Sequence, residues 1–127
     1  MDIVVGVDGS AASVAALRWA VGEAASRGVS VQAWHAWHVT YSGSGVPPDD
    51  LAAEAGARKA LDRAVEAVDA RGVAVERVLV RAVAASALID AGRRASLVVV
   101  GRGGGAVGGV AAQVLAHAPC PVVVVPG

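Results

Sequence analysis

Apolar runs and helix-like stripes alternate along this chain from its first residues onward. Residues 3–7, IVVGV, are apolar at every position, which is typical of a parallel strand buried on both faces. The turn sequence DGSAAS follows, and Ser10 within it is a favourable N-cap. Apolar residues then recur at helical spacing: Val14, Leu17, Val21 and Ala24. The pattern predicts a strand, a tight turn and a helix that ends at Gly28.

The same alternation continues to the last residues. Strands are predicted over 29–37, 73–80, 96–101 and 121–125, and helices over about 50–71, 85–94 and 109–117. The long helix is expected to start at a cap made by Asp49 or Asp50, to end at Gly72 and to bury a stripe of Leu51, Ala55, Leu61, Val65 and Val68. Strands alternating with helices predict one α/β domain, residues 1–127, with a parallel sheet covered by helices on both faces.

Composition and charge narrow the class of protein. Eleven basic and eleven acidic residues give a net charge of zero, which points to neither nucleic acid nor an anionic membrane as a partner. No apolar run reaches the length of about 18 to 20 residues that a bilayer-spanning helix needs. Asp2 stands where a signal peptide would carry positive charge, and Cys120 is the only cysteine. These features favour a cytoplasmic location.

Two turns that directly follow predicted strands carry residues suited to binding a ligand. Ligands of open α/β sheets bind beyond the carboxyl ends of the strands. Asp8 follows the first strand and can accept hydrogen bonds from a ribose or an adenine amino group. The sequence GRGGGAVGG follows the fourth strand, and its glycines allow backbone N–H groups to approach phosphate oxygens. The alternative for Asp8 is a structural role in the turn or as a helix cap. The alternative for the glycines is a flexible connection between a strand and a helix.

Other residue groups give no catalytic or metal-binding pattern. The glycine turn lacks the lysine of a P-loop, and the only lysine is Lys59 in the long helix. His35 and His38 are three apart on a strand, so they are expected on opposite faces. No third group stands near His117 and Cys120 in sequence to complete a Cys–His site. We therefore expect a binding protein without a metal, not an enzyme.

The tryptophans divide between two expected roles. Trp19 and Trp34 are expected to fill the core, and Trp37 is the one expected to cover a ligand.

The two ends of the chain together resemble the universal stress protein family. The resemblance rests on VVGVDGSAASVAALRWAVGEAASRG at the start and LVVVGRGG…HAPCPVVVV at the end. It implies a doubly wound five-stranded parallel sheet of order 3-2-1-4-5, in the three-layer α/β/α fold of the adenine nucleotide alpha hydrolase-like proteins. It also implies dimers that pair through the fifth strand and, in one branch, ATP bound between the ends of strands one and four.

The resemblance also implies which residues would bind the nucleotide. They are Gly6, Asp8, Ala36, Val100, Gly101, Gly103, Gly104, Gly108, Gly109 and Val110. Residues 105–107 stand where the family pattern has nine residues, so the phosphate loop is six residues shorter, and Gly109 replaces a hydroxyl residue. Residues 82–84, AVA, stand where the family often has Gly-x-Pro. Fewer contacts to a triphosphate make AMP or cyclic AMP alternatives to ATP.

The last predicted strand is a run of four valines. In the implied order, Val122, Val123, Val124 and Val125 form an edge strand, and an apolar edge needs a partner to avoid aggregation. An antiparallel pair of copies would satisfy it and give a homodimer. The leading hypothesis is a cytoplasmic stress-response dimer with a weakened adenine-nucleotide site. The alternative is a regulatory protein that interacts with partners and has lost ATP binding.

Overall fold

The computed structural model describes residues 1–38, 49–103 and 109–126. Within these ranges, five strands and four α-helices alternate. Its elements are β1 (Asp2–Gly6), α1 (Ala11–Arg27), β2 (Val31–Trp37), α2 (Asp50–Glu66), β3 (Val75–Arg81), α3 (Ala84–Ala91), the short 3₁₀ helix η1 (Gly92–Arg94), β4 (Ala95–Gly101), α4 (Gly109–His117) and β5 (Val122–Val125). The predicted alternation is confirmed.

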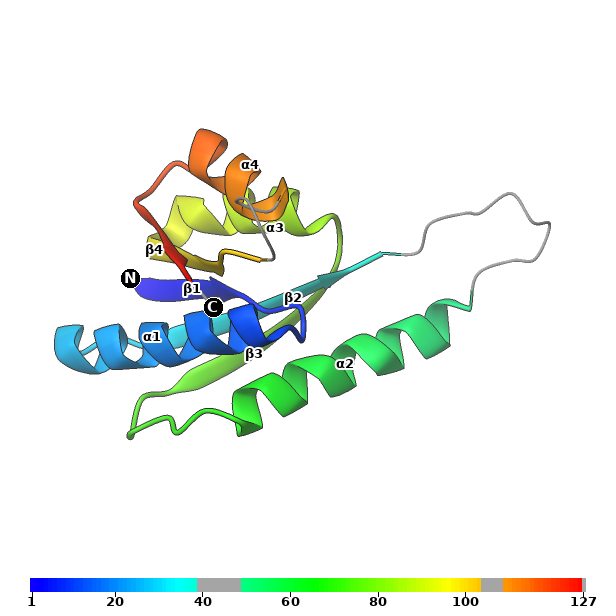
Figure 1. The fold of residues 1–127 in the computed structure, drawn as a ribbon, viewed down its shortest axis with the longest axis horizontal. Helices are drawn as coiled ribbons and strands as arrows, with labels where there is room; N and C mark the ends of the chain where they lie inside the picture. Colours follow the sequence, from blue (N-terminus) through cyan, green and yellow to red (C-terminus); the bar gives the residue numbers. More distant parts are fainter. Residues whose placement is uncertain (39–48, 104–108, 127) are drawn as a thin grey trace.

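The strands form one sheet with the order β3-β2-β1-β4-β5, and every neighbouring pair is parallel. Helices α1 and α2 cover one face, and α3 and α4 cover the other (Figure 1). The expected doubly wound fold and its 3-2-1-4-5 order are therefore confirmed. The order reverses between β1 and β4, because the chain first builds outward from β1 to β3 and then returns to the other side of β1.

Each face of the sheet has its own apolar core. The larger core lies beneath α1 and α2 and is centred on Ile3, Val5, Leu17, Leu61 and Val99. The smaller core lies beneath α3 and α4, and its buried members are Val4, Leu88, Ala95, Val98, Val100, Ala111 and Val114. Strands β1 and β4 contribute to both cores, because alternate residues of a strand face opposite sides. Their unbroken apolar runs reflect this double burial.

The predicted caps of the first two helices are present. Ser10 accepts a hydrogen bond from the Ser13 backbone N–H at 3.2 Å, and Gly28 closes α1 in the left-handed conformation at φ 70°. Asp49, and not Asp50, caps α2, since its Oδ1 accepts from the Ala52 N–H at 3.0 Å.

The prediction that α2 ends at Gly72 is wrong, because the helix ends at Glu66. Beyond it, Asp69 Oδ1 accepts a hydrogen bond from the Arg71 N–H at 3.0 Å. This local bond competes with helical hydrogen bonding. Arg71 and Gly72 then both take positive φ angles, 51° and 79°, which a helix does not accommodate. The chain turns there into β3.

Three apolar residues predicted to be buried are exposed. Leu51 and Ala55 were assigned to the buried stripe of α2, but Leu51 is 81% exposed and Ala55 is exposed as well. Trp19, assigned to the core, is 37% exposed. Helix α2 covers β2 and β3 at the border of the sheet. Fewer of its residues are therefore buried against the core. Its buried residues are Ala57, Leu61 and Ala64.

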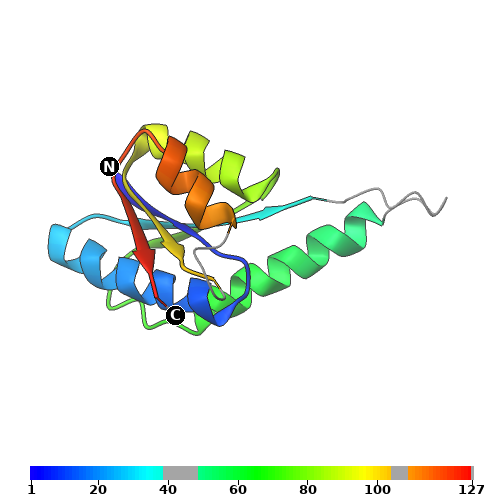
Figure 2. The same ribbon diagram turned by 45° about the horizontal axis from the view of Figure 1, so that its top comes forward.

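Three acidic residues of α2 form ion pairs, in two different ways. Glu54 pairs with Arg58 one turn later along the helix, with a separation of 3.8 Å. Asp50 and Asp62 instead reach across to Arg81 and Arg77 of β3, at 3.0 and 2.6 Å. The β3 edge of the sheet therefore carries charged side chains, whereas β5, the outermost strand on the other side, consists of four valines (Figure 2).

Candidate functional site

A hollow opens at the carboxyl ends of β1, β2 and β4, beside the point where the strand order reverses. Its empty space is about 490 Å³ when the open solvent at its mouth is included. Helix α3 contributes one wall through Ala84, Ala87 and Leu88, and Val110 at the start of α4 contributes another part. Most of the lining is apolar. This is the place where open α/β sheets bind ligands.

Small residues on the strands shape the floor of the hollow. Gly6 is the register partner of Trp34 across the β1–β2 pair. A Cβ atom at Gly6 would lie 2.7 Å from Leu88 Cδ1, so Leu88 occupies the room that the missing side chain leaves. Ala36, two residues after Trp34, also lines the hollow with a single methyl group. The hollow therefore has a tightly packed apolar floor and a wider mouth.

Asp8 supplies the carboxylate at this site. Its Oδ1 accepts a hydrogen bond from the Ser10 N–H at 2.9 Å, and its own N–H donates to Ser13 Oγ at 3.3 Å. Burial raises the pKa of Asp8, but the hydrogen bonds from Ser10 and Ser13 together lower the pKa by more, so it lies below the usual value. Asp8 is thus a turn aspartate, as in the alternative interpretation, and also an exposed carboxylate that remains ionised at neutral pH.

Gly101 is required first of all by packing. A Cβ atom there would lie 2.6 Å from both the carbonyl carbon and the carbonyl oxygen of Ala12 in α1. The backbone of β4 and the start of α1 are therefore in direct contact. Gly109, in contrast, has open space where a Cβ would stand. Packing therefore requires a glycine at position 101 but not at position 109.

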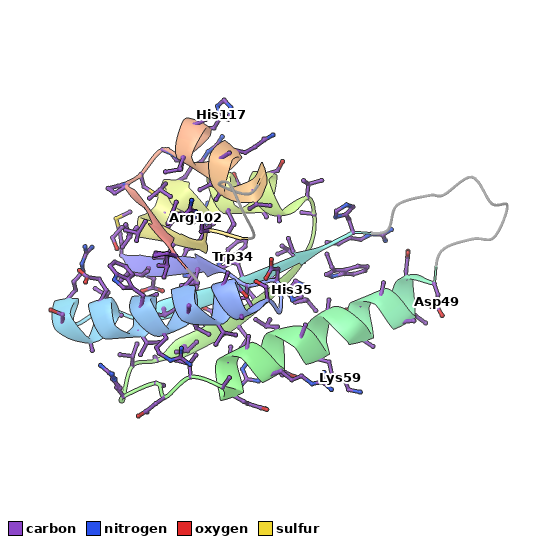
Figure 3. All side chains as sticks on the ribbon, in the orientation of Figure 1. Trp34, His35, Asp49, Lys59, Arg102 and His117 are labelled. Carbon is purple, nitrogen blue, oxygen red and sulfur yellow. The ribbon has the colours of Figure 1, made fainter. Side chains whose placement is uncertain are left out.

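The structure brings most of the predicted site residues together. Those that line the hollow are Gly6, Asp8, Ala36, Val100, Gly101 and Val110. Gly103 and Gly109 are described but do not line it; Gly103 adopts a φ of 77° just after β4. Gly104 and Gly108 lie outside the described residues. Arg102 ties β4 to β5, since its N–H donates to the Val125 carbonyl at 2.9 Å (Figure 3).

Sequence reasoning missed half of the lining. The additional residues are Val7, Ser13, Trp34, Ala84, Ala87 and Leu88. A signal for Trp34 was present, because a residue two positions before Ala36 on a strand shares its face. The α3 residues recur at helical spacing, but only the sheet order shows that this helix covers the ends of β1 and β2.

Trp37 and His35 lie on the opposite face of the sheet from the hollow. Trp37 packs beneath the guanidinium of Arg81, whose carbon is 5.5 Å from the ring centroid. Burial lowers the pKa of His35, and the Asp8 carboxylate offsets only part of this shift. His35 is therefore neutral at neutral pH. The expectation that Trp37 covers the ligand site is wrong among the described residues, since Trp34 is the indole that lines it.

No metal centre is evident in the part of the chain that the structure describes. Within residues 1–38, 49–103 and 109–126, no three His, Cys, Asp or Glu side chains gather closely enough to hold an ion. Burial raises the pKa of the Cys120 thiol, which keeps it protonated and a poor nucleophile. Over the same ranges, none of the helices combines the length and apolarity needed to cross a bilayer. Lys59 projects from α2, and His117 lies at the end of α4 (Figure 3).

The fold and the site define a doubly wound α/β protein with a hollow at its switch point. A sequence model described as the universal stress protein family matches residues 1–126. The chain is 39% identical to the universal stress protein Rv2028c of Mycobacterium tuberculosis, over 98% of this chain and 47% of that one. The chain therefore belongs to the universal stress protein family. It spans about half the length of the curated relatives it matches.

Solved structures agree with this assignment. A universal stress protein from Burkholderia pseudomallei matches with a TM-score of 0.80 at 31% identity, covering 99% of this chain and 96% of the other. A universal stress protein from Archaeoglobus fulgidus, solved in complex with dAMP, matches with a TM-score of 0.75 at 29% identity, over 98% of this chain and 96% of that one. The fold is accordingly that of the adenine nucleotide alpha hydrolase-like group.

Proposed function

We propose that this chain binds an adenine nucleotide in the hollow at the ends of β1, β2 and β4. The observation that carries the proposal is the combination of an apolar floor with the ionised Asp8 carboxylate beside it. A flat heteroaromatic base fits the apolar part, and its amino group or the ribose hydroxyls can donate to a carboxylate. The dAMP complex of the Archaeoglobus fulgidus protein supports the same ligand class.

The proposed nucleotide is ATP held weakly, with AMP and cyclic AMP as alternatives. Among the hollow's described lining residues, only Asp8 and Ser13 carry a polar group outside the backbone and the Trp34 indole. The Ser13 hydroxyl is already engaged, since it donates to the Ser10 carbonyl at 2.9 Å and accepts from Asp8. Apolar contact therefore supplies most of the binding surface. This favours a base and its sugar over the phosphates.

Replacing Asp8 with alanine is expected to weaken nucleotide binding about tenfold or more, since a hydrogen bond to a charged group contributes about 1.5–3 kcal/mol. Calorimetric titration with ATP, ADP, AMP and cyclic AMP measures the loss. Asp69→Ala is the matched control, because Asp69 is also exposed and also accepts a hydrogen bond from the N–H two residues on, at 3.0 Å. It removes a similar turn bond far from the hollow and is expected to leave affinity unchanged.

The outcomes of this titration separate the two functional hypotheses. A wild-type protein that releases no heat with millimolar nucleotide would support the alternative, a regulatory protein acting without nucleotide. Binding that Asp8→Ala leaves intact would show that the nucleotide occupies another place. We further infer that the protein binds without catalysis, so ATP recovered after prolonged incubation is expected to be intact.

We also propose that two copies pair through β5 to form a cytoplasmic stress-response homodimer. The carbonyl of Pro121 accepts a hydrogen bond from Val98 of β4 at 3.0 Å, and that of Val125 accepts one at 2.9 Å from Arg102, directly after β4. Because backbone groups alternate in direction along a strand, the amides of Val122 and Val124 face the open side. These groups and the uncharged valine side chains form an edge that a second copy can extend.

Proline at position 124 is expected to convert the dimer to a monomer. Val124→Pro removes an N–H that faces the open side and leaves the hydrogen bonds to β4 in place. Val124→Thr is the matched control, since it keeps the N–H and a β-branched side chain. Light scattering after gel filtration gives the mass, and circular dichroism checks the fold. A folded Val124→Pro protein that remains dimeric would exclude β5 as the interface.

A further inference from the structure

A second hollow opens on the α3 face of the sheet, beside the end of that helix. Its empty space is about 740 Å³ when the open solvent at its mouth is included. Strands β1 and β2 contribute its floor, and the end of α3 and η1 contribute its wall. The lining includes Val4, Gln32, Trp34, Asp90, Arg93 and Arg94. Only Trp34 also lines the hollow proposed for the nucleotide, so the two hollows are separate.

The floor combines an apolar surface with a hydrogen-bond donor. Val4 and Gln32 are register partners in the β1–β2 pair, and Val4 is buried whereas Gln32 is half-buried. Trp34 Nε1 donates to Gln32 Oε1 at 2.9 Å, and Gln32 Nε2 donates to Asp2 Oδ2 at 3.0 Å. An amide nitrogen carries two hydrogens and Asp2 accepts one, so the second can be donated to a ligand. The same bonds hold the indole of Trp34 in one orientation.

The wall that carries the arginines is fixed by packing. Gly92 begins η1, and a Cβ atom there would lie 3.1 Å from Pro119 Cδ and 3.3 Å from Cys120 Sγ. The backbone of this turn is therefore in close contact with the segment that leads into β5. Arg93 and Arg94 extend from that turn, so their positions relative to the floor are set by the fold.

The charges of the second hollow leave a surplus of one positive charge. Asp90 and Arg93 form an ion pair at 3.7 Å, and because both side chains are 74% exposed, this pair is weak. Within residues 1–38, 49–103 and 109–126, no ion pair joins Arg94 to an acidic side chain. Two arginines and one aspartate match a ligand with a single negative charge. A polyphosphate would place additional negative charge beside Asp90.

We propose that the second hollow binds a small aromatic carboxylate. Arginine guanidinium groups bind a carboxylate through paired, charge-assisted hydrogen bonds, which assigns the anionic end of the ligand to Arg93 and Arg94. An aromatic ring packs on the indole of Trp34, and the Gln32 amide donates to a polar group on the ligand. This site lies outside the nucleotide hollow, and it does not depend on the nucleotide-binding function.

Fluorescence of Trp34 measures binding to the floor of this hollow. The Trp19→Phe/Trp37→Phe protein keeps Trp34 as its only tryptophan, because the chain has three. Benzoate at millimolar concentration is expected to change its emission. Benzamide has the same shape without the charge, and acetate has the charge without the ring. Each is expected to require about tenfold or higher concentration, since each loses one of the two kinds of contact.

Arg94→Gln tests the wall of the hollow. In the wild-type background, this substitution is expected to weaken benzoate binding about tenfold or more in calorimetric titration, because it removes a charged donor. Arg58→Gln is the matched control, since Arg58 is also an exposed arginine but lies on α2, at the other face of the sheet. It is expected to leave the affinity unchanged, as is Asp8→Ala. Thermal melting confirms that each variant is folded.

Three results would overturn the proposal. The first is a wild-type protein that releases no heat with millimolar benzoate and a single-tryptophan protein whose emission does not change. The second is a folded Arg94→Gln protein that binds benzoate as tightly as the wild type, which would show that the carboxylate is held elsewhere. The third is benzamide binding as tightly as benzoate. Failure of AMP to bind would overturn the nucleotide function alone.

Discussion

Gly101→Ala is expected to lower the free energy of unfolding by about 3 kcal/mol, toward the upper end of the usual cost of overpacking. The new methyl group would stand 2.6 Å from two backbone atoms of Ala12, and 2.9 Å from its Cβ. A flexible side chain could move aside, but the backbone of α1 cannot move without displacing residues such as Ala16 and Leu17, which are buried against the sheet. Urea denaturation measures the loss.

Gly56→Ala provides the matched control, since it makes the same chemical change within a helix. No atom lies within 4 Å of a Cβ at Gly56. Alanine is favoured over glycine inside a helix by about 1 kcal/mol, so this variant is expected to be slightly more stable than the wild type. If the free energy of unfolding of Gly101→Ala lies within about 0.5 kcal/mol of the wild-type value, β4 and α1 are not packed as described.

Leu61→Ala is expected to cost about 3 kcal/mol, within the range for deleting a buried leucine side chain. Leu61 is 1% exposed and belongs to the larger core beneath α1 and α2. Removal of its side chain leaves a cavity between α2 and the sheet, because its neighbours come from α1 and the strands and cannot all collapse inward. The free energy of unfolding in urea again gives the measure.

Leu51→Ala tests the same chemical change on the same helix at an exposed position. Leu51 is 81% exposed, so the substitution is expected to change stability by less than about 0.5 kcal/mol. Equal losses for the two variants would contradict the orientation of α2. The helical spacing predicted that both leucines are buried, so this pair of variants also tests the finding that only Leu61 is.

The elements and their order follow from local patterns in the sequence. Strands β1 and β4 are apolar at successive positions because both faces are buried, and Ser10, Gly28 and Asp49 mark helix ends through their own hydrogen bonds or backbone angles. The end of α2 could not be predicted in this way. It depends on a bond from Arg71 to Asp69 and on two consecutive positive φ angles, which an apolar stripe does not reveal.

Part of the site was predictable. Asp8 follows directly from its place after the first strand, and the family resemblance also implied the lining residues Gly6, Ala36, Val100, Gly101 and Val110. The wall formed by Ala84, Ala87 and Leu88 depends on where α3 crosses the sheet, which is a property of the topology. Trp19 and Trp34 were treated alike because both are large and apolar, yet one is exposed on α1 and the other lines the hollow.

The pairing of β1 with β4 has a consequence for synthesis. Ser96 Oγ donates to the Asp2 carbonyl at 3.2 Å, although 94 positions separate the two residues. A nascent chain emerges N-terminus first, so one side of β1, with the apolar residues Ile3, Val4 and Val5, has no strand to pair with until β4 has been translated. An unpaired apolar edge invites aggregation. We therefore expect chaperones to bind ribosome-bound nascent chains that end before β4.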